Sequence, residues 1–162
     1  MSLDRRRSAG YMTNWAARLF AAAIERRLKP RGLSPAHLPI FFALGDGESL
    51  TQKELAAAAA VEQPTMAATL ARMERDGLIR RGPDPDDGRS SRVALTDAAL
   101  RAVDDVRRAT EAVNALALAA LDDGERDAFL VLLGKVIAAL AEDAPAKPPR
   151  PPRPAHAAKR SR

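Results

Sequence analysis

The side chains best suited to do chemistry in this 162-residue sequence are arginines that stand near hydroxyls and carboxylates. Thr65, Arg72 and Arg75 follow one another at intervals of seven and three residues, which places them on one side of a helix. Arg89 follows Asp87 by two residues in a segment rich in turn formers. A guanidinium group is a planar fork of donors that suits phosphate oxygens and the acceptor edge of guanine. These residues therefore predict hydrogen bonding to a nucleic acid.

The residues that catalysis or metal binding would need are scarce. Cysteine is absent and the only histidines are His37 and His156, which excludes a thiol nucleophile, a disulfide and a histidine-rich metal centre. A glycine-rich phosphate loop after a strand is missing as well. Asp84, Asp86 and Asp87 cluster, but without the glycine and distal glutamate of a calcium loop, so a turn explains them better. We therefore expect no enzyme, no metal and no cofactor.

Helical spacing of apolar residues, abundant alanine and few aromatics predict a mainly α fold that positions these arginines. A first helix is expected over 8–29 and a second over 34–44, with Pro39 bending the second. Thr51 and Glu54 have the capping-box spacing and open a short helix to about residue 60. The next helix, 63–76, starts with proline in its first turn and ends at a glycine. The last two form a helix-turn-helix.

A β-hairpin is expected directly after this helix pair. Short strands over 78–81 and 92–96 flank the turn-rich segment 83–88. Two more helices follow. One is expected over 97–121, and the other begins at Asp122-Asp123-Gly124-Glu125, where a cap acceptor is followed by a carboxylate three residues on, and runs to about residue 141.

These elements predict one domain over 1–143 and a separate tail. The domain consists of a DNA-binding lobe, 34–96, between candidate dimerisation helices in 8–33 and 97–141. Residues 144–162 are basic and proline-rich, and we expect them to be disordered. The net charge of +5 comes from this tail, whereas residues 1–143 carry 20 basic and 21 acidic groups. Bulk charge therefore says little about DNA binding by the domain.

Three stretches resemble the MarR family: 33–44, 50–81, and the hairpin as far as Leu95-Thr96. The most specific is 63–79, which reads QPTMAATLARMERDGLI. Asp87-Gly88-Arg89 then matches the family's Asp-x-Arg wing signature. The order and spacing of elements fit over about 8–141. The family's glycine a few residues after Leu-Thr is missing, and the basic tail lies outside the family pattern.

The resemblance implies a winged helix-turn-helix transcription regulator. It further implies a homodimer built from the first and the last two helices, and in many members a repressor released by a small aromatic or anionic effector. Apolar stripes on the first and last helices independently predict a two-fold dimer, which would bind a pseudo-palindromic double-stranded operator.

A helical wheel orients the helix over 63–76. Met66, Leu70 and Met73 share a narrow sector and should face the core, while the opposite surface would enter the major groove. The alanines there offer only apolar contact, so we expect phosphate contacts and DNA shape to carry much of the affinity. The predicted DNA-binding residues are Gln63, Pro64, Thr65, Ala68, Thr69, Arg72, Arg75 and Arg89.

Two of these assignments have structural alternatives. Asp87 should pair with Arg89 and aim its guanidinium, which the resemblance points into the minor groove, but the two could also form a pair that only stabilises a turn. Arg72 and Arg75 could be ordinary solvated charges.

Trp15, His37 and Phe41 could line an effector pocket or simply belong to the core.

Asn14, Arg18 and Glu25 interrupt the apolar N-terminal stretch, so we expect a cytoplasmic protein with no membrane segment.

Two alternatives share the winged helix. A nucleoid-type architectural protein would bind DNA without choosing sequence, and the ratio of specific to non-specific affinity distinguishes it from a regulator. A winged helix that serves only protein contacts would show no salt-dependent DNA binding.

Overall fold

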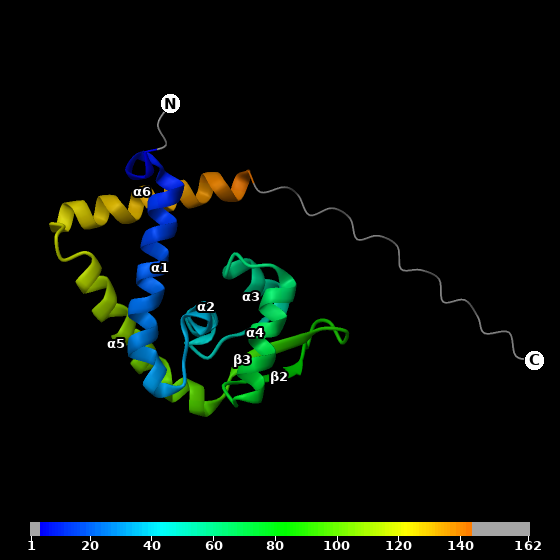
Figure 1. The fold of residues 1–162 in the computed structure, drawn as a ribbon. Coiled ribbons are helices and arrows are strands. Elements are labelled where there is room, and N and C mark those ends of the chain that lie inside the picture. Colours follow the sequence, from blue (N-terminus) through cyan, green and yellow to red (C-terminus); the bar gives the residue numbers. More distant parts are fainter. Residues whose placement is uncertain (1–3, 144–162) are drawn as a thin grey trace, which may run out of the picture. The chain divides into compact units, whose positions relative to one another are not determined.

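The computed structural model describes residues 4–143 (Figure 1), which divide after Ala119 into two compact units. Among the described residues, no helix combines the length and apolar character needed to cross a membrane. The predicted tail, 144–162, lies outside the described residues.

The first unit is built on two long helices, α1 (Ala9–Leu28) and α5 (Asp97–Ala117), which pack against each other. Ser8 caps α1 by accepting a hydrogen bond from the Tyr11 N–H. The end of α1 is buried through Ala23, Ile24 and Leu28, whereas Met12, Trp15 and Leu19 near its start are 40–60% exposed. Only one end of α1 therefore joins the core of this unit.

The segment predicted as one bent helix over 34–44 is divided in two. A 3₁₀ turn, η3 (Pro35–His37), precedes α2 (Leu38–Leu44), and Pro39 lies in the first turn of α2. A proline in a first turn costs no helical hydrogen bond, so α2 needs no bend to accommodate it. Two further 3₁₀ turns of the same length, η1 (Arg5–Arg7) and η2 (Lys29–Arg31), flank α1.

The helix-turn-helix is formed as predicted, by α3 (Gln52–Ala58) and α4 (Gln63–Arg75). The capping box is confirmed: Thr51 Oγ1 accepts from the Glu54 N–H, and the Glu54 carboxylate accepts from the Thr51 N–H at 2.7 Å. Gly77 follows α4 with φ of 71°, and the Leu78 N–H closes the last turn onto the Met73 carbonyl at 2.8 Å. Both ends of the pair are thus fixed by local hydrogen bonds.

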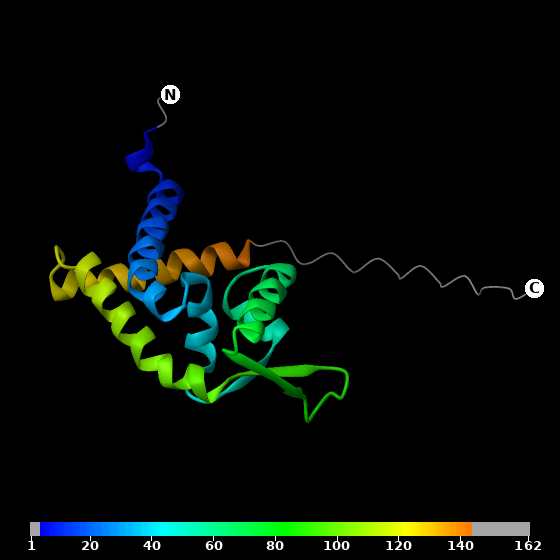
Figure 2. The same cartoon turned by 60° about the horizontal axis from the view of Figure 1, so that its bottom comes forward.

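The hairpin of β2 (Ile79–Pro83) and β3 (Ser91–Leu95) is confirmed, and it extends away from the helices of this unit (Figure 2). The sheet has a third strand that the sequence analysis missed, β1 (Ser49–Thr51), in the antiparallel order β1-β3-β2. Leu50 lies opposite Val93 and Thr51 opposite Arg92. The base of the wing is therefore hydrogen-bonded to the segment that starts α3.

The core of the first unit lies where the sheet meets α2, α3, α4 and α5. Val93, Leu70 and Met73 are fully buried there. Thr96 joins α4 to α5, because its hydroxyl donates to the Gly77 carbonyl at 2.8 Å and accepts from the Ala99 N–H that opens α5. The helix predicted over 97–121 ends earlier, at Ala117.

The second unit contains α6 (Asp123–Glu142), which begins with the predicted Asp122–Glu125 capping box. Its large apolar side chains Phe129, Leu132, Ile137 and Leu140 are 41–67% exposed. Exposed apolar surface of this extent is typical of an interaction site.

Candidate nucleic-acid interface

The orientation predicted for α4 is confirmed. Met66, Leu70 and Met73 are at most 2% exposed, and they fix which side of the helix faces out. The outer side carries Pro64, Thr65, Ala68, Arg72 and Arg75, all exposed, while Gln63 at the first position is half-buried. The surface combines two cations with small and apolar groups, as the sequence indicated.

Thr69 was predicted to flank this outer surface, and the structure instead buries it to 6% exposure. Its hydroxyl donates to the Thr65 carbonyl at 3.1 Å, which satisfies a buried polar group within the helix. The same oxygen accepts a hydrogen bond from Arg72 Nη2 at 3.4 Å. Thr69 therefore lies behind Arg72 and restricts its guanidinium.

Two other arginines on or near α4 each pair with a carboxylate. Arg75 Nε lies 3.0 Å from the carboxylate of its neighbour Asp76. Arg81 on β2 pairs with Glu74 at 3.1 Å. Such exposed pairs contribute little energy, so both arginines can exchange their carboxylate for a phosphate.

The starts of α3 and α4 are joined by a side-chain hydrogen bond. Gln52 Nε2 donates to Gln63 Oε1 at 3.3 Å. Beside it, hydrogen bonds from the Thr51 backbone and hydroxyl lower the pKa of Glu54, so its carboxylate stays ionised and keeps capping α3. An open hollow of about 570 Å³ adjoins these residues and the wing.

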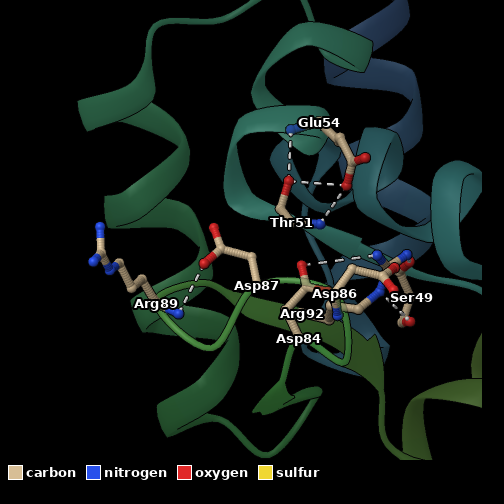
Figure 3. A network of polar contacts seen from close by, with 8 residues as sticks. All are labelled: Ser49, Thr51, Glu54, Asp84, Asp86, Asp87, Arg89 and Arg92. Carbon is tan, nitrogen blue, oxygen red and sulfur yellow. Dashed lines mark hydrogen bonds and ion pairs between the residues drawn. The ribbon is translucent and has the colours of Figure 1, made fainter.

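Asp87 and Arg89 are in contact, but in a different way from the predicted ion pair. Asp87 Oδ1 accepts from the backbone N–H of Arg89 at 3.0 Å, and the Arg89 side chain extends away from this carboxylate (Figure 3). Asp87 therefore shapes the turn that carries Arg89 and does not hold its guanidinium. Among the described residues, that guanidinium has no polar partner.

Arg92 holds the wing loop to the sheet, a role that the sequence analysis did not identify. Arg92 Nε donates to Ser49 Oγ at 2.9 Å, and Nη2 donates to the Ser49 carbonyl (Figure 3). Its Nη1 lies 4.0 Å from the carboxylate of Asp84, whose side chain is only 8% exposed. Asp84 in turn accepts from the Asp86 N–H. The role could have been recognised only by predicting β1, because the pairing of β1 with β3 brings Ser49 beside Arg92.

The three residues suggested for an effector pocket differ in exposure. Phe41 is in the core at 3% exposure, and Trp15 is 40% exposed with its ring edge-to-face against Tyr11. His37 is buried, and its Nδ1 accepts from the Ser34 N–H at 3.3 Å. Burial, and secondly the positive charge of Arg72, lower the pKa of His37, while Asp76 offsets part of this effect. Phe41 and His37 thus act as core residues.

A capped helix-turn-helix with an outward cationic helix, followed by a wing that presents an unpaired arginine, defines a winged helix-turn-helix DNA-binding protein. The sequence profile of the MarR family matches residues 31–90. A solved MarR family transcriptional regulator from Silicibacter pomeroyi is 30% identical, over 85% of this chain and 93% of that one, with a TM-score of 0.71. The chain therefore belongs to the MarR family of transcription regulators.

Two further relatives agree with this assignment. The HTH-type transcriptional repressor NicR of Pseudomonas putida is 28% identical over 134 residues, which cover 83% of this chain and 85% of that protein. A probable transcriptional regulator from Pseudomonas aeruginosa is 27% identical, over 82% of this chain and 99% of that one, with a TM-score of 0.74.

Proposed function

We propose that this chain is a sequence-specific repressor that a small molecule releases from its operator. The observation that carries the DNA-binding part is the outward face of α4, where Thr65, Arg72 and Arg75 are exposed while the opposite face is locked into the core. In this proposal the DNA contacts come from Gln63, Pro64, Thr65, Ala68, Arg72, Arg75 and the wing residue Arg89. Thr69 contributes by restricting Arg72.

Relatives support the repressor role and the binding of a small ligand. NicR is named a repressor. The fold is also that of the Escherichia coli MarR protein crystallised with operator DNA and of PcaV from Streptomyces coelicolor, crystallised with its natural ligand, at 20% and 24% identity. Such a regulator needs no catalytic group, and it acts in the compartment that holds the DNA, the cytoplasm of a bacterium.

A hollow between α1 and α5 suits a small aromatic or anionic effector better than the predicted Trp15, His37 and Phe41. It measures about 380 Å³ and opens to solvent. Its walls include Phe20 and Val113, and Arg26 supplies a cation at its edge. Apolar walls with a few polar groups are typical of small-molecule sites.

We further propose a two-fold homodimer in which α1, α5 and α6 supply the interface and 34–96 supplies the DNA-binding lobe. The exposed apolar side chains Trp15, Leu19 and Leu116, together with those of α6, exceed what a soluble monomer usually leaves uncovered. A dimer places two α4 helices on one face, so its operator should have half-sites about 10 bp apart. Sedimentation that finds a stable monomer at micromolar concentration would contradict this assembly.

Selection of bound sites from random duplex DNA tests the function directly. A regulator enriches a pseudo-palindrome that it binds at least roughly a thousandfold more tightly than random DNA at a stated salt concentration. Salt-dependent binding that enriches no sequence would indicate the architectural alternative, and the absence of salt-dependent DNA binding would indicate a winged helix that serves only protein contacts. The effector hollow is tested by adding a panel of aromatic acids to the protein–DNA complex and measuring release of the DNA. Arg26→Gln removes the cation of the hollow and should make release by the acids weaker.

The tail makes a separate contribution in this proposal. Its six basic residues and no acidic ones should contact phosphates without choosing sequence: Lys147, Arg150, Arg153, Lys159, Arg160 and Arg162. Each phosphate contact adds about 0.9 to the slope of log affinity against log salt. Truncation after Asp143 should flatten this slope and preserve operator preference, whereas an unchanged slope would mean that the tail does not bind DNA.

A further inference from the structure

The hydrogen bond between Gln52 and Gln63 lies at the position where a helix-turn-helix reads bases. Gln63 is the first residue of α4, and the N-terminal part of the recognition helix is the part that contacts base edges in the major groove. Gln52 is the first residue of α3, eleven positions earlier, and its Nε2 donates to Gln63 Oε1 at 3.3 Å. The side chain best placed to read a base is therefore already engaged by a neighbouring helix.

The two glutamines are attached to rigid backbone. The Thr51–Glu54 capping box fixes the start of α3, and Leu55 in the same helix is 1% exposed. Met66 fixes the first turn of α4 at 2% exposure. Both glutamine side chains are half-buried, and both border the open hollow of about 570 Å³. The pair is thus held in place and still accessible to a DNA edge.

The direction of the hydrogen bond decides what Gln63 can offer. An amide has an acceptor oxygen and a two-donor nitrogen on opposite arms. Because the oxygen arm is turned toward Gln52, the NH₂ arm is the one left to face outward. Within the described part of the chain, that NH₂ group donates to no protein atom. Gln63 is therefore presented to DNA as a donor.

We propose that Gln52 is a positioning residue that turns the Gln63 amide so that its NH₂ group faces the major groove and selects a base with an acceptor edge. This inference rests on the proposed sequence-specific binding by α4. In the major groove guanine presents the acceptors O6 and N7, thymine presents the acceptor O4, and adenine presents the acceptor N7 beside its amino donor, whereas cytosine presents only the donor N4. Gln63 should then discriminate against cytosine on the contacted strand at one position of each half-site.

The experiment is selection of bound sites by the full chain, followed by affinities for operators that vary at a single position. Gln63→Ala identifies that position, because its base preference should fall by about tenfold. Gln52→Met removes the donor while keeping a side chain of similar length, and it should relax the preference at the same position. The double variant should be no worse than Gln63→Ala, since Gln52 acts through Gln63.

Gln52→Glu gives the most specific outcome. A glutamate can only accept at neutral pH, so Gln63 must turn its NH₂ group inward and present its oxygen to the groove. The preference should then shift from guanine or thymine toward cytosine or adenine, whose amino groups donate. Lys53→Ala is the matched control, because removal of this exposed neighbouring cation should weaken binding to all sites alike.

The failures can be told apart. If the wild-type chain enriches no sequence, the proposed function fails. If it enriches an operator but Gln52→Met and Gln52→Glu keep the wild-type base preference, only the positioning role of Gln52 is overturned. If Gln52→Glu binds DNA too weakly to measure because of its charge, Gln52→Met alone decides, since it carries no charge.

Discussion

Asp87 and Arg89 are linked through the backbone, with the Asp87 carboxylate accepting the Arg89 N–H at 3.0 Å while the guanidinium points elsewhere. This geometry changes the expected behaviour of Asp87 variants. Asp87→Asn keeps a side-chain acceptor for the turn and should bind operator DNA within about threefold of the wild type. Asp87→Ala removes the acceptor and should cost about 1 kcal/mol of binding, roughly fivefold in affinity.

Affinities of Asp87→Asn, Asp87→Ala and Arg89→Ala for one operator check this expectation. Arg89→Ala should be the most severe of the three, because a minor-groove arginine contributes both charge and shape readout. Equal losses for Asp87→Asn and Asp87→Ala would instead support the direct ion pair that the sequence suggested.

The link between Arg92 and Ser49 predicts that the wing depends on a residue that does not touch DNA. Arg92→Ala leaves the 8% exposed carboxylate of Asp84 with one partner fewer and frees the wing loop from β1. Because the variant loses this ion pair and the hydrogen bonds of Arg92 to Ser49, the free energy of unfolding should fall by about 1–3 kcal/mol. Adding Asp84→Asn should recover part of the loss, because a neutral amide costs less to bury than a carboxylate.

Urea unfolding at a fixed protein concentration measures these stabilities, and affinity for the operator reports the wing. In an Arg89→Ala background, Arg92→Ala should cause little further loss of affinity if it acts only by holding the loop. A large additional loss would show that Arg92 contacts phosphate itself.

The elements that the sequence predicted well are those with local signals. The capping boxes at Thr51 and Asp122, the glycine stop at Gly77 and the apolar stripe of α4 each depend on residues close together in the chain, and the structure confirms them. What it missed depends on distant partners. β1 is only three residues long and exists because it pairs with β3, and the contact of Arg92 with Ser49 spans 43 positions.

The candidate site shows the same division. Exposure of Thr65, Arg72 and Arg75 follows from helical periodicity and was predictable. The burial of Thr69 was not, because Thr69 lies at the edge of the apolar sector, where the neighbouring elements decide exposure and a hydrogen bond within its own helix satisfies the hydroxyl. The Gln52–Gln63 contact likewise requires the angle between two helices, which periodicity does not supply.

Ala60 offers a test of strain in the turn of the helix-turn-helix. It has φ of 50°, in the left-handed region, which costs an L-residue about 1–2 kcal/mol. Glycine avoids this cost but loses about 0.5–1 kcal/mol through its flexible unfolded state. Ala60→Gly should therefore raise the free energy of unfolding by roughly 0.5 kcal/mol. Ala58→Gly within α3 is the control and should lower it by about 1 kcal/mol. If both variants lose stability equally, the turn is not strained.

His37 gives the expected pH dependence of stability. Burial favours its neutral form, so its pKa is lower in the folded chain than the value of about 6.5 in the unfolded chain. Between these two values the unfolded chain binds more protons, and stability therefore falls as pH is lowered. The contribution is fully present above the unfolded pKa and is lost as pH falls from there through the folded pKa. Protonation would also replace the acceptor that Nδ1 offers to the Ser34 N–H and bring a second positive charge near Arg72.

The variant His37→Asn isolates this effect, because asparagine does not titrate and its oxygen can still accept from the Ser34 N–H. Urea unfolding from about pH 7.5 to pH 5, at one protein concentration, should show a steeper loss of stability in the wild type than in the variant. The groups that titrate elsewhere are common to both proteins, so the difference between the two curves belongs to His37. Parallel curves would mean that the imidazole is protonated as readily in the folded chain as in the unfolded one, and that burial beside Arg72 does not govern its charge.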